Sequence, residues 1–359
     1  MTARSCHDLC RRIARRIEAL PDRPVRLMEV CGTHTVAIHR AGLRGLLPPR
    51  LRLVSGPGCP VCVTPQTYVD ALIELAGRPG VRVATYGDMI RVPGRSTTLE
   101  RAMARGARVS VVYSIMEALS LARQAPAEQV VFAGVGFETT APATAVGLKL
   151  AADERLANFT VLSAHKLIIP AMTALLESGD LAIDGFLCPG HVSVIIGADA
   201  YKPLAARFAR PCVVAGFEAE EILRAIDLLV AQLADGRAEV ENAYARVVTA
   251  DGNRRAWALI EETFEPADTP WRGLGTIPGS GLAIRAELAH LDAARRFGLE
   301  ITAREDDHGC RCGEVIRGAI EPPECPLFAR ACTPASPVGP CMVSREGNCQ
   351  ACYKYSRAL

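Results

Sequence analysis

The side chains with the most chemical potential in this chain are its cysteines, of which it has 14 in 359 residues. Two of them form Cys59-Pro60-Val61-Cys62, directly after Gly56-Pro57-Gly58. The Cys-x-x-Cys spacing is that of a redox dithiol, and a helix beginning near Pro60 would stabilise the Cys59 thiolate as the attacking nucleophile. Half of a zinc site or two inert buried thiols are the alternatives. The exposed glycine- and proline-rich turn favours redox or metal chemistry.

A second motif pairs Cys31 with His34 in the sequence Cys31-Gly32-Thr33-His34-Thr35. A thiolate with a nearby imidazole suits a transition metal, whereas the alternative is a buried thiol beside a capping histidine. This motif follows the first predicted strand, and the dithiol follows the second. Because the two motifs lie at adjacent strand ends, the metal site is favoured.

Glu138, His165, Lys166 and His191 are weaker candidates, because carboxylates and histidines near helix starts often only cap them. Four other cysteines lie in apolar runs or on the first helix, and we predict that they belong to the core: Cys6, Cys10, Cys188 and Cys212.

The end of the chain is rich in cysteine, proline and glycine from Glu305 onward and needs a staple to fold, for which a metal is the natural candidate. It has more cysteines than one metal centre requires: Cys310, Cys312, Cys325, Cys332, Cys341, Cys349 and Cys352. Ligation by four cysteines suits zinc or an iron-sulfur cluster, and the irregular gaps favour the cluster. Spacing alone does not assign the ligands.

Eight apolar, β-branched runs alternate with helix-like segments and position these motifs. They begin at Val25, Leu51, Val81, Arg108, Val130, Phe159, Asp184 and Pro211. This order predicts an α/β protein with two Rossmann-like parallel sheets of four strands each. The sheets would form domains 1–125 and 126–240. A mostly helical, cysteine-rich iron-sulfur domain would follow at 241–359. Because ligand sites in such sheets lie beyond the carboxyl ends of strands, the motifs should converge there.

Two amphipathic helices are predicted, one at the N-terminus around Leu9, Ile13 and Ile17, and one over 219–236 that ends at a glycine. Mostly helix is expected from there to Leu299, interrupted by the turn-rich sequence GLGTIPGSGL.

The composition excludes several classes of function. A net charge of +2, from 41 basic and 39 acidic residues, argues against nucleic-acid or anionic-membrane partners. No signal peptide, membrane span or P-loop motif is recognisable, so we predict a cytoplasmic protein whose cysteines serve metal or redox chemistry.

Taken together, CGTHT, GPGCPVC, GFETTAP, the HK and PGHVS turns and the ending CPLFARACTPASPVGPCMVSREGNCQACYKY resemble the HypD family of [NiFe]-hydrogenase maturation proteins. The resemblance covers nearly the whole chain. It implies two α/β domains and a cluster-bearing C-terminal domain. It also implies a redox-active scaffold, not a conventional turnover enzyme, on which iron with cyanide and carbon monoxide ligands is assembled. The implied partners are a HypC-type small chaperone and a cyanide-donating HypE-type maturation protein.

Position by position, the resemblance makes Cys31 the iron ligand with His34 beside it, and Cys59 and Cys62 the dithiol that exchanges electrons with the cluster. Three further residues would complete the cleft between the domains: Glu138, His165 and His191. The [4Fe-4S] ligands would be Cys310, Cys325, Cys332 and Cys349, with Cys341 and then Cys312 in reserve. Cys352 departs from the family pattern.

Two other functions stay open on the sequence alone. One is an iron-sulfur thiol-disulfide oxidoreductase that uses Cys59 and Cys62 on a protein or small-molecule disulfide. The other is a zinc-stapled binding protein without a redox role.

Overall fold

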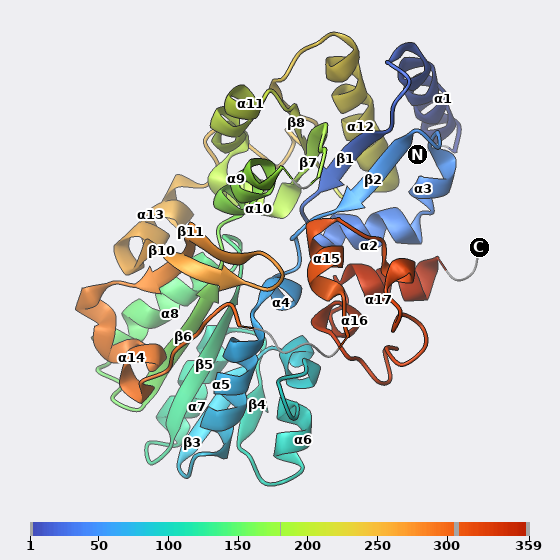
Figure 1. The fold of residues 1–359 in the computed structure, drawn as a ribbon. Coiled ribbons are helices and arrows are strands. Elements are labelled where there is room, and N and C mark those ends of the chain that lie inside the picture. The colour runs from blue at the N-terminus through green and yellow to red at the C-terminus, as the bar shows by residue number, and fades with distance from the viewer. Residues whose placement is uncertain (1–2, 180, 305–308, 357–359) are drawn as a thin grey trace.

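Two parallel β-sheets and a cysteine-rich C-terminal segment make up the structure, a computed structural model that describes residues 3–179, 181–304 and 309–356 (Figure 1). The first sheet has the order β2-β1-β7-β8-β9, and the second has the order β4-β3-β5-β6. The strands of the first sheet are β1 (Val25–Glu29), β2 (Leu51–Ser55), β7 (Gly185–Pro189), β8 (Cys212–Ala215) and β9 (Val240–Asn242). Those of the second are β3 (Val81–Thr85), β4 (Val109–Val111), β5 (Gln129–Gly136) and β6 (Phe159–His165).

All eight predicted strands are present, and all pairs within the two sheets are parallel. The predicted grouping of four consecutive strands in each half is wrong: β1 and β2 pair with β7 and β8, so a boundary near residue 125 does not separate the sheets. Asp184 explains part of this arrangement, because its carboxylate accepts hydrogen bonds from Arg26 N at 2.8 Å and from the Arg23 guanidinium, which holds the start of β7 beside β1.

Helices cover the sheets on both faces, as strands with nearly continuous apolar burial require. The longer helices are α1 (Ala3–Ala19), α2 (Gly32–Arg40), α5 (Gln66–Gly77), α7 (Ile115–Gln124), α8 (Ala141–Asp153), α9 (Ile168–Ser178), α12 (Ala219–Ala234) and α13 (Arg254–Thr263). The shorter ones are α3 (Leu43–Leu46), α4 (Pro60–Val63), α6 (Leu99–Met103), α10 (Gly190–Ile196), α11 (Lys202–Phe208) and α14 (Ala293–Phe297), with 3₁₀ turns η1 (Gly87–Arg91), η2 (Ala198–Tyr201) and η3 (Ala286–Leu291).

The two predicted amphipathic helices are α1 and α12, and they pack against each other over the first sheet. Their apolar stripes are buried, and the Arg16 guanidinium reaches across to the buried Asp227 carboxylate at 2.6 Å. The chain leaves α12 through Gly236, whose φ of +66° glycine adopts without a steric penalty.

The segment that follows differs from the mostly helical prediction. An antiparallel hairpin of β10 (Phe264–Trp271) and β11 (Gly275–Ile284) lies beside the second sheet, and the turn-rich sequence GLGTIPGSGL forms its turn and most of β11. Trp271, at the end of β10, is fully buried, and its ring centroid lies 5.9 Å from that of Phe137. Pairing with this anchored strand holds the glycine-rich segment in the extended conformation of β11. Among the described residues, no helix is long and apolar enough to cross a membrane.

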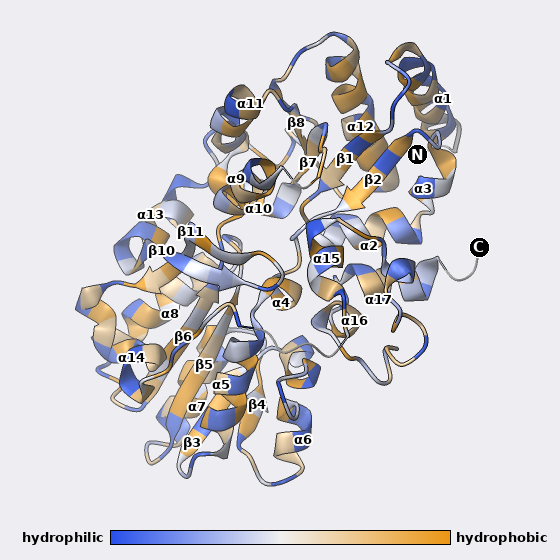
Figure 2. Cartoon of the chain, in the orientation of Figure 1, coloured by the Kyte–Doolittle hydropathy of each residue, from blue (hydrophilic) through white to orange (hydrophobic). Residues whose placement is uncertain are grey.

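The cysteine-rich segment folds as short helices joined by turns: α15 (Cys312–Arg317), η4 (Pro322–Glu324), α16 (Pro340–Val343) and α17 (Asn348–Tyr355). These pack on α2, α4 and β2, at the lower edge of the first sheet in Figure 1. Figure 2 shows orange, pale and blue stretches mixed along this segment, whereas strand β5 of the second sheet is largely orange. Four of its buried cysteines share one apolar cluster with the first sheet and with the dithiol helix α4, so the segment does not have a separate core: Cys312, Cys332, Cys341 and Cys349.

Candidate functional site

The loops after β1 and β2 bring the two cysteine motifs together. Gly32 N donates to Gly58 O at 3.2 Å, and a Cβ atom at position 58 would lie only 2.1 Å from Cys31 N. Only glycine permits this close approach of two backbones. The loop that carries Cys31 is therefore packed directly on the loop that carries the dithiol, as the convergence at strand ends predicts.

Cys31 is the N-cap residue of α2, and its side chain is buried, with 8% of the residue exposed. Burial raises the pKa of the Cys31 thiol to about 12, and the nearby Glu346 and Glu29 carboxylates act in the same direction. A thiol of this kind holds its proton in the free protein. A metal cation would supply the positive charge that lets it ionise.

Two carboxylates that sequence reasoning missed flank Cys31. Glu29 accepts hydrogen bonds from Cys31 N at 3.0 Å and Thr35 Oγ1 at 2.5 Å, and burial raises its pKa to about 7. Glu346, from the loop before α17, accepts from Thr33 Oγ1 at 2.8 Å. A carboxylate inside the apolar run VRLMEV is a signal that could have identified Glu29, whereas nothing in the spacing of Glu346 indicates it.

His34 has one ring nitrogen without a partner. Its Nε2 lies 2.9 Å from Gly216 O, and because a carbonyl only accepts, Nε2 carries the proton and Nδ1 keeps a lone pair. This Nδ1 is buried without a hydrogen bond, and burial lowers the pKa of His34 to about 4. The Phe217 ring lies between His34 and His191, with centroids 4.9 Å and 4.0 Å away, so both histidines belong to the same side of the site.

The dithiol has the predicted helix start. Helix α4 begins at Pro60 with Cys59 as its N-cap, the Cys59 Sγ accepts from Cys62 N at 3.3 Å, and the two Sγ atoms are 2.6 Å apart. Burial raises the pKa of Cys62, and its hydrogen bond to Cys341 acts in the same direction. The Cys341 sulfur accepts from Cys349 and Cys62, which holds its pKa well below the usual range. Cys341 therefore lies close to both the dithiol and Cys349.

Cys310, Cys312 and Cys332 make contacts with one another's loops. A hydrogen bond from Cys312 lowers the pKa of Cys310, and a Cβ atom at Gly339 would lie 2.6 Å from the Cys310 sulfur. The Cys332 sulfur accepts from Val338 N at 3.3 Å, the kind of hydrogen bond that tunes cluster thiolates.

Within the described ranges, no three or more His, Cys, Asp or Glu side chains are grouped so that they could hold a metal ion. A [4Fe-4S] cluster makes a different demand, since its four thiolates each bind a different iron at the corners of a cubane. Cysteine thiols and a backbone N–H donor to sulfur are the groups that such a cluster uses, and its binding here stays a prediction. Cys352 lies near Arg44 and Glu321, and burial raises its pKa.

Glu138, His165 and Lys166 lie elsewhere in the structure. His165 hydrogen bonds Thr144 Oγ1 at 3.0 Å, and burial lowers its pKa to about 3. The buried Lys166 ammonium donates to Thr269 Oγ1 at 2.8 Å and to Pro270 O at 3.0 Å. Glu138 lines a separate cavity whose walls contain no cysteine. Their part in the site stays a prediction, whereas Cys188 and Cys212 are fully buried core residues, as predicted.

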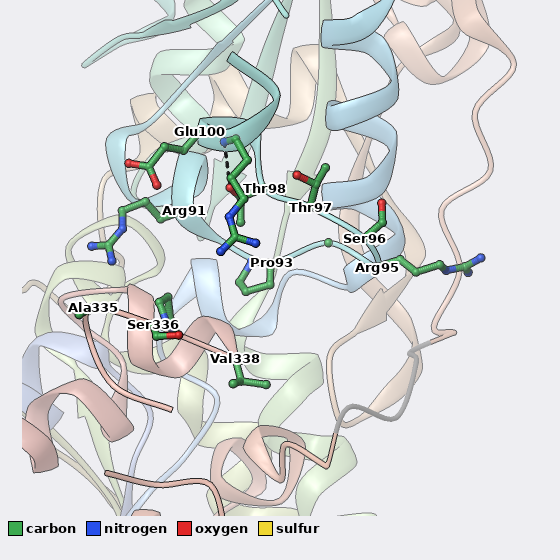
Figure 3. Close-up of a pocket in the computed structure, with 13 residues that line it drawn as sticks. Arg91, Pro93, Arg95, Ser96, Thr97, Thr98, Glu100, Ala335, Ser336 and Val338 are labelled. Carbon is green, nitrogen blue, oxygen red and sulfur yellow. Dashed lines mark hydrogen bonds between the residues drawn. The ribbon is translucent and has the colours of Figure 1, made fainter. Parts of the chain in front are cut away.

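The turn η1, which follows β3, fastens the cysteine-rich segment to the second sheet. The Asp88 carboxylate accepts hydrogen bonds from Ser344 Oγ and Arg345 N, both at 3.2 Å. Arg91 donates to Pro334 O at 2.5 Å. Figure 3 shows Arg91 and Thr98 facing Ser336 across the hollow between the two parts, which has a volume of about 410 Å³.

Comparisons with known proteins give a consistent result. The family model HypD, described as "Hydrogenase formation hypA family", matches residues 5–356. A hydrogenase maturation factor HypD from Azotobacter vinelandii is 49% identical over 356 residues, covering 97% of this chain and 94% of the relative. The HypD maturation factor of Cupriavidus necator is 45% identical over 98% of this chain and 95% of its own length, and that of Escherichia coli is 46% identical over 93% and 90%.

Proposed function

The chain belongs to the HypD family of hydrogenase maturation factors, and from this premise we propose that it is the scaffold on which the iron of a [NiFe] hydrogenase receives cyanide and carbon monoxide ligands. The iron is the cargo of the reaction, and Cys31 anchors it. The observation that carries this proposal is the direct packing of the Cys31 loop on the dithiol loop, with Cys341 joining the dithiol to the C-terminal cysteines.

Cys31 suits an anchor because a thiolate is a soft ligand for low-spin iron and leaves the other coordination positions open. The His34 Nδ1 lone pair lies on the first turn of the helix that Cys31 caps, without a partner inside the protein. The Glu346 and Glu29 carboxylates add negative charge beside the thiol, which favours a bound cation. Cys31 supplies one ligand, and the further ligands to the iron come from molecules that dock beside this loop.

Those molecules are a HypC-type small chaperone, which shares the iron, and a HypE-type maturation protein, which donates cyanide. The cleft residues Glu138, His165 and His191 remain part of this proposal. His191 has the strongest structural support, because it is exposed and stacks on the Phe217 ring that also contacts His34.

The dithiol supplies the redox part of the proposal. Reduction of a Cys59–Cys62 disulfide takes two electrons and two protons and gives two thiols. When bound, a [4Fe-4S] cluster supplies single electrons at low potential. We assign its ligands to Cys310, Cys325, Cys332 and Cys349. Cys341 is left as the cysteine between Cys349 and Cys62, a position that suits a link between the cluster and the dithiol better than cluster ligation.

The test is anaerobic purification of the chain together with its small chaperone, followed by measurement of iron, acid-labile sulfide and the infrared spectrum. We expect cluster iron plus additional iron with cyanide and carbon monoxide bands. Cys31→Ala should abolish these bands and leave the sulfide content unchanged. Cys10→Ala, which changes a half-buried cysteine on α1, should leave both unchanged.

The other outcomes point to other functions. Cluster iron without infrared bands in the unchanged protein, together with rapid reduction of disulfides, would favour the thiol-disulfide oxidoreductase. Zinc without labile sulfide would exclude both and favour the stapled binding protein. Loss of sulfide in Cys31→Ala would show that Cys31 belongs to the cluster.

A further inference from the structure

A buried arginine at the turn of the β10–β11 hairpin joins the hairpin to the dithiol helix α4 (Figure 1). Arg272 is 6% exposed. Its backbone N–H donates to Val63 O at 2.8 Å, and its Nε donates to Thr64 O at 3.1 Å. Val63 is the last residue of α4 and Thr64 is its C-cap, so Arg272 fixes the end of the helix whose start carries the dithiol.

The same turn packs against the cysteine-rich segment. A Cβ atom at Gly273 would lie 2.4 Å from Gly313 Cα, so the two backbones are in direct contact beside Cys312. The hydrogen bond between the Cys310 and Cys312 thiols has the largest effect on the pKa of each, and the positive charge of Arg272 acts to lower the pKa of both. The guanidinium therefore lies close enough to these two sulfurs to interact with them electrostatically.

The Arg272 guanidinium has no carboxylate counter-ion within residues 3–179, 181–304 and 309–356, and its Nη2 is buried without a hydrogen-bond partner. An arginine side chain does not lose its proton in a protein, and a buried charge is costly unless an opposite charge accompanies it. The sulfurs of Cys310 and Cys312 become negative when they ionise or bind a metal cluster. They can therefore supply the missing counter-charge.

We propose that Arg272 is a positioning residue for the redox step: it holds the dithiol helix against the loop of Cys310 and Cys312, and its cation stabilises the negative charge that the cluster gains on reduction. The inference rests on the cluster binding proposed above. Reduction adds one electron and no proton, so the charge of the cluster becomes more negative by one while no bond forms or breaks. A fixed cation at a buried position favours this change and raises the reduction potential.

The test measures the reduction potential of the cluster in the full chain, purified without oxygen and titrated with dithionite as the electron donor. Electron paramagnetic resonance reports the reduced cluster. Arg272→Gln removes the charge, and the equilibrium constant for adding the electron should fall about tenfold, which corresponds to a potential about 59 mV lower. Arg272→Lys keeps the charge, and its equilibrium constant should stay within about threefold of the original. Arg255→Gln, at an exposed position on α13, is the matched control and should leave the potential unchanged.

Two results of this titration would overturn the proposal. One is an unchanged potential in Arg272→Gln. The other is an equal fall in Arg272→Gln and Arg272→Lys, because a structural change and not the charge would then be the cause. If Arg272→Gln does not retain acid-labile sulfide, Arg272→Met replaces it with the same expectation, since methionine is uncharged and leaves no buried amide without a partner. If Arg272→Met loses its sulfide too, Arg272→Lys decides: retained sulfide supports the role of the charge, and lost sulfide overturns it.

The outcomes separate this proposal from the maturation function. A potential that does not respond to Arg272→Gln, in a protein that still shows cyanide and carbon monoxide bands, would overturn the role of Arg272 alone. Absence of labile sulfide from the unchanged protein would overturn the cluster assignment, and the role of Arg272 with it.

Discussion

At the scale of single residues, burial shifts the pKa values of ionisable side chains at the ends of the strands away from those of the same side chains in solvent. Burial raises the pKa of Glu138 to about 7 and lowers that of His165 to about 3, so both are neutral over part of the range in which the free side chains are charged. Each therefore links the stability of the fold to pH.

For Glu138 the direction of this link is fixed. The native protein keeps the proton up to about pH 7, whereas the unfolded chain releases it around the ordinary value of 4.5, so the stabilisation by the neutral form is lost as the pH rises through this window. Glu138→Gln cannot ionise. Its free energy of unfolding should exceed that of the unchanged protein at pH 8 by up to about 3 kcal/mol, and the difference should shrink toward zero near pH 4.5.

Urea unfolding followed by circular dichroism at pH 5 and pH 8 measures this difference. Glu18→Gln provides the control, since that side chain is exposed. An equal gain in stability for Glu138→Gln at both pH values would contradict the raised pKa and would point to packing as the cause.

Cys341 carries the second prediction at this scale. As the cysteine between Cys62 and Cys349, it should help to transmit electrons to the dithiol without binding the cluster. Cys341→Ser should keep its acid-labile sulfide and lower the rate at which dithionite, acting through the cluster, reduces the Cys59–Cys62 disulfide by at least about tenfold. Alkylation of the new thiols and mass spectrometry follow the reaction, with Cys352→Ser as the control. Loss of sulfide in Cys341→Ser would instead make Cys341 a cluster ligand.

Sequence reasoning found the residues that stand directly after strands, because a parallel sheet delivers all of its carboxyl ends to one edge. Cys31 and Cys59 are of this kind. It did not find Glu346 or the bridging place of Cys341, which depend on how a distant, irregular segment docks onto α2 and α4.

At the scale of elements, the contact between the loops after β1 and β2 is the feature that sets the geometry of the site. Gly58→Ala places a methyl carbon only 2.1 Å from Cys31 N, so the two loops must separate. We expect a loss of about 1–3 kcal/mol in the free energy of unfolding and a parallel loss of chaperone-dependent iron. Gly45→Ala is the matched control, because a Cβ atom there meets nothing within 4 Å, and its effect should stay within about 0.5 kcal/mol.

Denaturant unfolding and iron analysis of the two variants decide the matter. Similar behaviour of Gly58→Ala and Gly45→Ala would mean that the close approach of the loops is not needed.

Sequence patterns predicted both strands that lead into this contact, but not the hairpin strand β11, whose glycines and proline are typical of turns. The partner strand β10 and the burial of Trp271 override that local preference.

At the scale of the whole molecule, the chain builds one sheet from its first two strands and from strands more than 100 residues later, and it inserts the other sheet between them. Local periodicity does not contain this information, since it depends on long-range pairs such as Asp184 with Arg26. The same interleaving lets the cysteine-rich segment touch both halves, through α2 and α4 on one side and through η1 on the other.

The Asp88 contacts are therefore expected to hold the cysteine-rich segment in register with the dithiol. Asp88→Ala removes the acceptor of Ser344 Oγ and Arg345 N, two hydrogen bonds at the edge of α16. Since each is worth on the order of 1 kcal/mol, amide hydrogen exchange over residues 340–349 should become roughly tenfold faster, while exchange in the strands of both sheets stays unchanged. Asp153→Ala, at an exposed position on α8, should leave exchange in this segment unchanged. If Asp88→Ala has no effect there, the shared apolar core with α4 alone holds the segment in place.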